Sequence, residues 1–433
     1  MSAPRLIVLA AACIGIVALP WILPAGQLVA ATQMLIAALF ACAFNLLAGQ
    51  SGMLSFGHAA YFGVGAFATL HLMGAIEDRI IAFPTPLLPL AGAVAGILVG
   101  AFAGYFATMR SGVYFALVTL AIAELFHSLA PHWDGLFGGE AGLSSMRMPW
   151  AGLTFGSPLQ VYYLALGWTV VSIFLLWAYT RTAFGRLTLA LRDNEQRVRF
   201  MGYNAHTTKV IIFSISAMFS GIAGALLAVS NETANYSLFS THVSAQVVLH
   251  TFVGGSTVFF GPAIGASIFT LFAFYISEVT RTWLLYQGLI FVLVMLYAPQ
   301  GIGGLVQTHI QHWSKISWPE LGRAYAVAAA VAVCLTSALV FVVESFAIIF
   351  SPEYAAVRGR LDGAWPPFKL FGLEWEVFSP FTWIIPLGLL AVGLLLLPTA
   401  RRMLRETWNH ILERAEAARI AKSEIQLAGA VES

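Results

Sequence analysis

Glu124 is the residue whose type and position most suggest chemistry. It lies well inside an early apolar segment, where a carboxylate is costly in hydrocarbon and tends to face the interior of a helix bundle. There it could bind a polar solute, carry a proton or an ion, or accept a hydrogen bond from a neighbouring helix. Thr119 lies near one helical turn away and is a candidate for the same face.

A second group of polar side chains lies in and just before a glycine-rich segment, residues 49–66. Glycine there lets two helices approach closely or lets one helix break, and a broken helix can offer freed backbone groups to a solute. The polar candidates are Asn45, Ser51, Ser55 and His58. Their alternative role is helix packing, which the small residues around them would also serve.

A third group lies in the charged segment 181–209, which contains six basic and two acidic residues. The apolar residues of a short amphipathic helix would be Leu187, Leu189, Leu191, Val198 and Met201, and Gly185 and Gly202, which bracket it, are expected to set its turns. Such a helix could contact a partner protein, although cytoplasmic loops also collect arginines through insertion bias alone. The candidates for a contact are Gly185, Arg186, Arg192, Asp193, Glu195 and Gly202.

The composition of the chain places these groups in a membrane protein. Of the 433 residues, 59% are hydrophobic and only 10% are charged, against roughly 25% charged in a soluble domain. No Asp, Glu, Lys or Arg occurs between Arg5 and Glu77, a stretch long enough for three membrane helices. A net charge of +2 gives no sign of a nucleic-acid surface, and neither cysteine nor histidine spacing indicates a metal site.

Hydropathy predicts an all-α polytopic membrane protein. About ten core transmembrane helices fall in residues 1–310, and two more fall in a C-terminal extension, 311–433, with an outer loop at 344–380 and a cytoplasmic tail at 400–433. The predicted spans are 6–24, 28–48, 56–76, 86–108, 112–130, 159–179, 209–230, 240–258, 261–277, 284–304, 324–343 and 381–399. With both termini cytoplasmic, sixteen Lys and Arg lie inside and six outside, as the positive-inside rule requires.

Four ordered motifs resemble one family, the permeases of branched-chain amino acid ABC importers of the LivM type. The resemblance covers about residues 28–310. The first motif comprises Asn45, Leu46, Leu47, Ala48 and Gly49, then Ser51, Gly52, Leu54, Ser55, Phe56, Gly57, His58, Ala59, Ala60, Phe62, Gly63, Gly65 and Ala66. The second comprises Gly112, Tyr114, Phe115, Ala116, Thr119, Leu120, Ala121 and Glu124. The third, similar to the family's coupling loop, comprises Phe184, Gly185, Arg186, Ala190, Leu191, Arg192, Asp193, Asn194, Glu195, Gly202 and Lys209. The fourth comprises Gly254, Gly255, Ser256, Gly261, Pro262, Gly265 and Ala266, ending with Pro299, Gly301 and Gly304.

The resemblance implies a permease subunit in a bacterial inner membrane that forms the path of a small solute such as a branched-chain amino acid. It implies as partners a second related permease, two ABC ATPase subunits that hold ATP and Mg, and a periplasmic solute-binding protein. Arg192 and Glu195 would be the first docking contacts for an ATPase. The chain departs from the family's pattern at residues 196–199 and in the region beyond about residue 313.

Two other function classes compete with this resemblance. An ion-coupled secondary transporter would use Glu124 as its proton or ion site and would need no partner. An integral membrane enzyme finds little support, because the sequence has no GxSxG or HExxH motif. It also has no GxxxxGK[ST] phosphate loop, so we expect no ATPase site and no cofactor bound by this chain itself.

Overall fold

The computed structural model describes residues 15–313, 316–361 and 364–431, with side chains as far as Arg414. It forms two compact units. The core unit comprises residues 1–276 and 287–307, and the C-terminal unit comprises residues 277–286 and 308–433.

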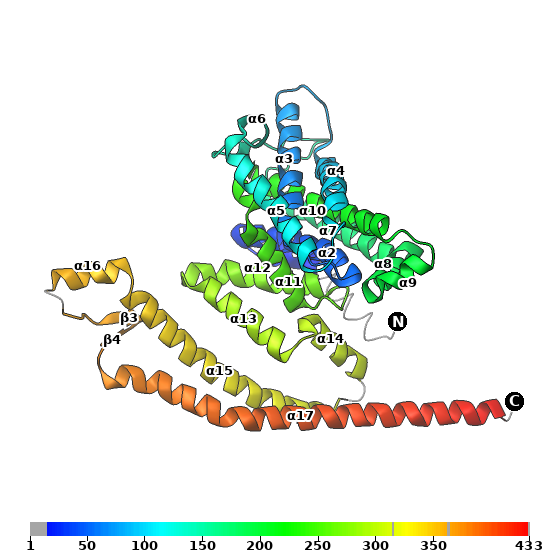
Figure 1. Ribbon diagram of the computed structural model, residues 1–433. Coiled ribbons are helices and arrows are strands. Elements are labelled where there is room, and N and C mark those ends of the chain that lie inside the picture. The colour runs from blue at the N-terminus through cyan, green and yellow to red at the C-terminus, as the bar shows by residue number, and fades with distance from the viewer. Residues whose placement is uncertain (1–14, 314–315, 362–363, 432–433) are drawn as a thin grey trace. The chain divides into compact units, whose positions relative to one another are not determined.

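The core unit is built almost entirely from helices (Figure 1). Its longer helices are α2 (Ala25–Asn45), α3 (His58–Glu77), α4 (Pro89–Ala107), α5 (Val113–Leu129), α7 (Pro158–Arg181), α8 (Ala183–Asp193), α10 (Ala205–Asn231), α11 (Thr241–Gly254), α12 (Gly261–Val279), α13 (Trp283–Tyr297) and α14 (Gly301–His312). Its short elements are η1 (Leu46–Gln50), η2 (Thr85–Leu87), η3 (Ala130–His132), α6 (Asp134–Phe137), α9 (Glu195–Phe200) and η4 (Tyr236–Phe239), with the paired strands β1 (Leu143–Ser144) and β2 (Thr233–Ala234). Proline begins α4 and α7, where its missing N–H costs no helical hydrogen bond.

Hydropathy and helix length confirm the all-α polytopic fold. In the described residues, nine helices are long and apolar enough to span a membrane, or ten if a bent pair, α13 and α14, makes one span. That pair bends by 47° at its break, which interrupts the predicted span 284–304. The predicted span 240–258 is wrong, because α11 has only 14 residues and reaches about 21 Å, short of the ~30 Å hydrocarbon core. The predicted span 6–24 lies partly outside the described residues.

Glycine allows the central helices of the core unit to touch through their backbones. The longest of them, α10, packs most extensively against α4 and α3. A Cβ atom at Gly65 of α3 or at Gly92 of α4 would overlap the backbone of Gly221 in α10. Small residues at such crossings are the usual means of helix association in membranes, because close approach maximises van der Waals contact.

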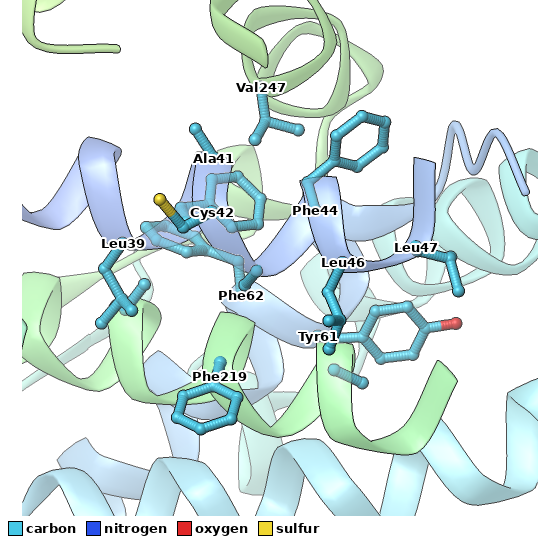
Figure 2. Close-up of a cluster of buried hydrophobic side chains, with 14 of the residues drawn as sticks. Leu39, Ala41, Cys42, Phe44, Leu46, Leu47, Tyr61, Phe62, Phe219 and Val247 are labelled. Carbon is cyan, nitrogen blue, oxygen red and sulfur yellow. The ribbon is translucent and has the colours of Figure 1, made fainter. Parts of the chain in front are cut away.

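Large apolar side chains fill the space around these crossings (Figure 2). Phe44 and Leu47 near the end of α2, Tyr61 of α3 and Phe213 of α10 are each fully buried. The rings of Tyr61 and Phe213 meet edge to face with centroids 5.3 Å apart. This packing fixes the end of α2 against α3 and α10, and the candidate polar residues of the first motif lie at the same place.

The C-terminal unit contains α15 (Trp318–Ile349), α16 (Pro352–Arg360), the hairpin of β3 (Phe368–Leu370) and β4 (Leu373–Trp375), and α17 (Pro380–Val431). Helices α15 and α17 lie side by side, and both are long and apolar enough to span a membrane (Figure 1). Phe341, Tyr354 and Phe368 are buried together with their neighbours and join α15, α16 and the hairpin. The segment between the two spans is therefore a small folded module.

A carboxylate holds α15 to the turn that joins α12 and α13. The hydroxyls of Thr280, Thr282 and Tyr286 donate to Oε1 of Glu344 at 2.6, 2.7 and 2.7 Å. Because all three donors are short and converge on one oxygen, this cluster satisfies a half-buried acidic side chain without a cation.

Candidate functional site

The end of α2 and the link that follows it form the first part of the site. Helix α2 continues into η1, a π-helical turn, and Gly52 then takes the left-handed conformation at φ +68°. The N–H of Met53 bonds back to the carbonyl of Leu47 at 3.1 Å, as in a helix end closed by glycine. Residues 52–57 are not helical, and α3 begins at His58, so the glycine-rich segment does hold a buried interruption.

His58 is buried and serves packing inside the chain. Its Nε2 lies 2.8 Å from the hydroxyl of Ser216, which itself donates to the carbonyl of Ala43 at 2.6 Å. Because that hydroxyl has a single proton, Nε2 of His58 must be the donor to it. The imidazole also packs edge to face on Phe44, with centroids 5.1 Å apart. It therefore joins α2, α3 and α10.

The other candidates of the first motif are also buried among groups of this chain. Ser51 donates to the carbonyl of Leu47 at 2.7 Å, and Ser55 accepts the N–H of Gly57 at 3.3 Å. The side chain of Asn45 is buried against Gly49, where a Cβ atom would overlap it. These contacts shape the interruption between α2 and α3.

Thr119 fastens the interruption to α5. Its buried hydroxyl donates to the carbonyl of Ala116 at 2.8 Å and accepts the N–H of Phe56 at 3.1 Å. Gly57 lies against the carbonyl of Thr119, and a Cβ atom at Gly57 would overlap that carbonyl. The hydroxyl of Ser244 in α11 accepts the N–H of Ala59 at 3.1 Å. The start of α3 is thus bonded to α5 on one side and to α11 on the other.

Glu124 is exposed on the surface of the core unit. Its Oε1 accepts a hydrogen bond of 3.0 Å from the hydroxyl of Thr241, the first residue of α11. Along α5 the exposed residues Leu117, Ala121 and Ser128 lie on the same stripe as Glu124. The structure therefore does not bring Glu124 together with Thr119, which faces inward.

The charged segment 181–209 folds into a pair of short helices, α8 and α9, called here the surface hairpin. Thr182 caps α8 by accepting the N–H of Gly185 at 3.0 Å, and Asn194 caps α9 by accepting the N–H of Arg197 at 3.0 Å. A single amphipathic helix was expected, but the cap at Asn194 divides it. Buried contacts join Leu191, Val198 and Ala205 inside the hairpin.

The two glycines of the surface hairpin have different roles. Gly202 has φ +87° and makes the turn after α9. Gly185 lies inside α8, and a Cβ atom there would overlap the carbonyl of Tyr179. Gly185 therefore permits a close approach to α7, whereas a turn had been expected at both glycines.

Glu195 forms the electrostatic centre of the surface hairpin. It pairs with Lys209 of α10 at 2.6 Å and with Arg199 at 2.6 Å. The side chain of Lys209 is only 7% exposed and also donates to Ser111, before α5, at 3.1 Å. Burial alone would raise the pKa of Glu195, but the bonds and charges of Lys209 and Arg199 outweigh it and hold this pKa below its usual value.

Arg192 bonds to the end of the interrupted helix. Its Nη1 donates to the carbonyl of Gly49 at 2.5 Å. A cavity of about 510 Å³ lies beside this bond, lined by residues 51–54 and 56, 110–113, 115–116, 191–195 and Lys209. Arg186 and Asp193 are exposed, and their side chains make no hydrogen bond or ion pair with another described residue.

The surface hairpin leaves an apolar face uncovered. Phe200 is 90% exposed, and Met201, Tyr203 and Leu189 are also exposed. Leu189 and Met201 had been counted among the apolar residues of the amphipathic pattern, yet both point away from the chain.

Sequence periodicity could not predict the pair of Lys209 and Glu195, because thirteen residues separate them in the sequence. A single lysine at the start of a predicted span was nevertheless a usable signal.

Sequence reasoning also missed Thr241 and Ser244, because nothing in a sequence alone shows which distant helix meets α5. No group of three or more His, Cys, Asp or Glu side chains that could hold a metal ion occurs within residues 15–313, 316–361 and 364–431. The chemistry of the site is thus that of hydrogen bonds, ion pairs and exposed surfaces.

These features define a polytopic membrane protein with a charged, partly apolar surface hairpin between two of its spans. Residues 26–299 match the family described as branched-chain amino acid transport system / permease component, and the chain belongs to that family. The match ends before the C-terminal unit's two long helices begin.

Three relatives are named as permease proteins of transport or import systems. The chain is 28% identical over 311 residues to the high-affinity branched-chain amino acid transport system permease protein LivM of Salmonella typhimurium, covering 66% of this chain and 72% of that protein. LivM of Escherichia coli gives the same identity and coverage. The autoinducer 2 import system permease protein LsrC of Escherichia coli is 26% identical over 197 residues, covering 42% of this chain and 54% of that protein.

No solved structure matches the chain. The relatives confirm the predicted role of an importer permease, and they do not support the ion-coupled secondary transporter.

Proposed function

We propose that this chain is the membrane subunit of an ATP-driven importer in a bacterial inner membrane, with a branched-chain amino acid or a related small solute as cargo. Its partners would be a second related permease, two ABC ATPase subunits that carry ATP and Mg, and a periplasmic solute-binding protein. The family match over residues 26–299 and the names of the relatives support this assignment. The sequence holds no phosphate loop, so the ATP would be hydrolysed by other chains.

The exposed apolar face of the surface hairpin is the observation that best supports an ATPase partner. Phe200, Met201 and Tyr203 are exposed on a hairpin that also carries Arg186 and Arg197. Aromatic and arginine side chains are the residues enriched at the centres of protein interfaces. Arg192 and Glu195, in contrast, already have partners inside the chain. We therefore assign docking to the face around Phe200.

The test of this function is mild-detergent purification of the tagged chain from its native membrane, with mass spectrometry of the proteins that accompany it. The native chain should recover two ATPase subunits and a second permease, and Phe200→Asp should lose the ATPases. Phe371→Asp is the matched control, because Phe371 is 67% exposed at the turn between β3 and β4. Recovery of the native chain alone, active in uptake that stops when a proton gradient is collapsed, would refute the proposal.

The exposed residues around Glu124 on α5 support a solute path that runs along this face of the helix. A carboxylate at membrane depth is too costly to face lipid, so the stripe around Glu124 should face a water-filled path or the second permease. Glu124 keeps one oxygen free of hydrogen bonds to other described residues, and Thr241 adjoins it. Such a carboxylate would suit the ammonium group of an amino acid. Asn45, Ser51, Ser55, His58 and Thr119 would then shape the path's wall without touching the solute.

Uptake of radiolabelled leucine by the reconstituted complex tests this path. Glu124→Gln should lower uptake and raise the solute concentration needed for half-maximal uptake, while ATPase subunits remain bound. Glu406→Gln, on the exposed part of α17, is the control for loss of a carboxylate. Unchanged uptake by Glu124→Gln would remove Glu124 from the path.

A further inference from the structure

The carbonyl of Gly49 lies at a helix end and accepts a hydrogen bond from Arg192. The last carbonyls of any helix lack N–H partners within the helix, and the helix dipole makes that end negative. Gly49 lies in the final turn of η1, and Nη1 of Arg192 donates to its carbonyl at 2.5 Å. A guanidinium at this position is favoured by both the hydrogen bond and the dipole.

The stem of Arg192 also lies against the turn that ends the helix. Gly52 adopts φ +68°, and a Cβ atom there would stand 3.0 Å from Cγ of Arg192. The glycine thus lets the arginine stem lie along the turn. The surface hairpin is held to the end of α2 and η1 by a polar contact and an apolar contact of one side chain.

Hydrogen bonds connect the segment after the turn that contacts Arg192 to the helices that carry Glu124 and Thr241. After Gly52, the N–H of Phe56 bonds to Thr119 at 3.1 Å, and the N–H of Ala59 bonds to Ser244 at 3.1 Å. Thr119 lies on α5 together with Glu124, and Ser244 lies on α11 together with Thr241. The link 51–57 and the first turn of α3 therefore join the surface hairpin to the two helices that carry Glu124 and Thr241.

The surroundings of Arg192 leave room for movement on one side. The cavity of about 510 Å³ separates the last turn of α8 from residues 110–116. Toward the start of α5 the hairpin is linked through Glu195, which pairs with Lys209, and Lys209 donates to Ser111. Arg192 is the hairpin side chain that bonds to the end of η1, so a displacement of α8 would reach the link 51–57 through it.

We propose that Arg192 is a positioning residue that transmits movement of the surface hairpin, through Gly49 and Gly52, to the link 51–57 and so to the helices that bear Glu124 and Thr241. This inference rests on the proposed function, since the movement would come from a docked ATPase. Arg192 acts inside the chain and does not bind the ATPase.

The experiment compares the native complex with Arg192→Ala, Arg192→Lys and Arg405→Ala, all purified as whole complexes and reconstituted in liposomes. Arg405 is the matched control, because it is an exposed arginine on α17, outside the surface hairpin. Loss of a charge-assisted bond should lower ATP-driven leucine uptake by about tenfold in Arg192→Ala, with ATP hydrolysis and subunit composition retained. Arg192→Lys should be intermediate, because a lysine keeps the charge without the planar fork. Arg405→Ala should keep its uptake.

Hydrogen exchange in the same complexes gives a readout that a merely structural role would not move. ATP should change exchange in residues 183–200 in every variant. It should change exchange in residues 51–57 in the native chain and in Arg405→Ala but not in Arg192→Ala. An ATP-dependent change at 51–57 that survives Arg192→Ala would overturn the inference, and so would loss of ATPase subunits from that variant, which would make Arg192 a docking contact. Absence of ATPases from the native chain would refute the proposed function itself, and this link with it.

Discussion

Replacing Glu195 by Gln should lower the local stability of the surface hairpin more than the loss of an exposed ion pair would. The change keeps the shape of the side chain but removes the charge that faces Lys209, whose side chain is only 7% exposed. The ammonium would keep its bond to Ser111 and lose its anion. Hydrogen bonds between charged groups contribute about 1.5–3 kcal/mol, so we expect a loss of about 2 kcal/mol in the local stability of α9.

The pair between Glu195 and Arg199 provides an internal comparison. The side chain of Arg199 is 66% exposed, and such surface pairs contribute about 0.5 kcal/mol. At about 1.4 kcal/mol for each tenfold change, Glu195→Gln should speed amide exchange in α9 by roughly 30-fold, and Arg199→Ala by only about twofold. Hydrogen exchange measured by mass spectrometry on the purified chain resolves this difference. Equal effects of the two substitutions would show that burial of Lys209 does not strengthen the pair.

The pH dependence follows from the direction of the pKa shift of Glu195. Its pKa is held below the usual value, so the stabilisation is fully present above the unfolded-state pKa and is lost as the pH falls through the lower, folded-state pKa. After correction for the intrinsic pH dependence of amide exchange, Glu195 should add no pH dependence to the protection of α9 between pH 6 and pH 8, and this protection should fall in acid. Glu195→Gln should remove this acid sensitivity. An acid response that persists in the variant would assign it to another carboxylate.

Two further predictions concern packing in each unit. Gly65→Ala should lower the melting temperature and the yield of folded chain, because its Cβ atom would overlap the backbone of Gly221; Gly74→Ala in the same helix meets nothing within 4 Å and should be neutral or slightly stabilising. Equal melting temperatures in a thermal-shift assay would contradict the close crossing of α3 and α10. Glu344→Leu should expose the C-terminal unit to limited proteolysis, because three hydroxyls lose their acceptor at a cost of about 1–3 kcal/mol, whereas Glu344→Gln keeps one acceptor oxygen and should be milder. Identical digestion of the two variants would argue against the hydroxyl cluster.

The fold class could be predicted from the sequence because lipid imposes a simple requirement, long apolar helices with few charges. The number of spans was harder to predict, because several kinds of helix meet this simple requirement. An uncharged stretch can be one span, a bent pair or a short buried helix, and hydropathy does not distinguish them. The 14 residues of α11 lie in such a stretch, and so does the 47° bend between α13 and α14.

The candidate site could be located but not assembled from the sequence. The charged hairpin, the interruption near Gly52 and the acidic residue in α5 were each found from residue type and spacing. Their partners depend on which helices cross, and that is set by surfaces such as the one around Gly221. Hence the contact of Arg192 with Gly49, and that of Glu195 with Lys209, could not be foreseen.

Two carboxylates on spans of this chain show why exposure and bonding, and not residue type, decide between a structural role and a solute contact. Glu344 is half-buried, and three hydroxyls converge on its Oε1 within 2.7 Å. Glu124 is exposed on α5 and accepts one hydroxyl, from Thr241 at 3.0 Å. A carboxylate already surrounded by short donors gains little from a cationic ligand, since those bonds must be disturbed first, whereas one with free acceptor capacity gains a full charge-assisted bond. The same residue type thus stabilises one unit through Glu344, and in the proposed solute path Glu124 would be available to a ligand in the other.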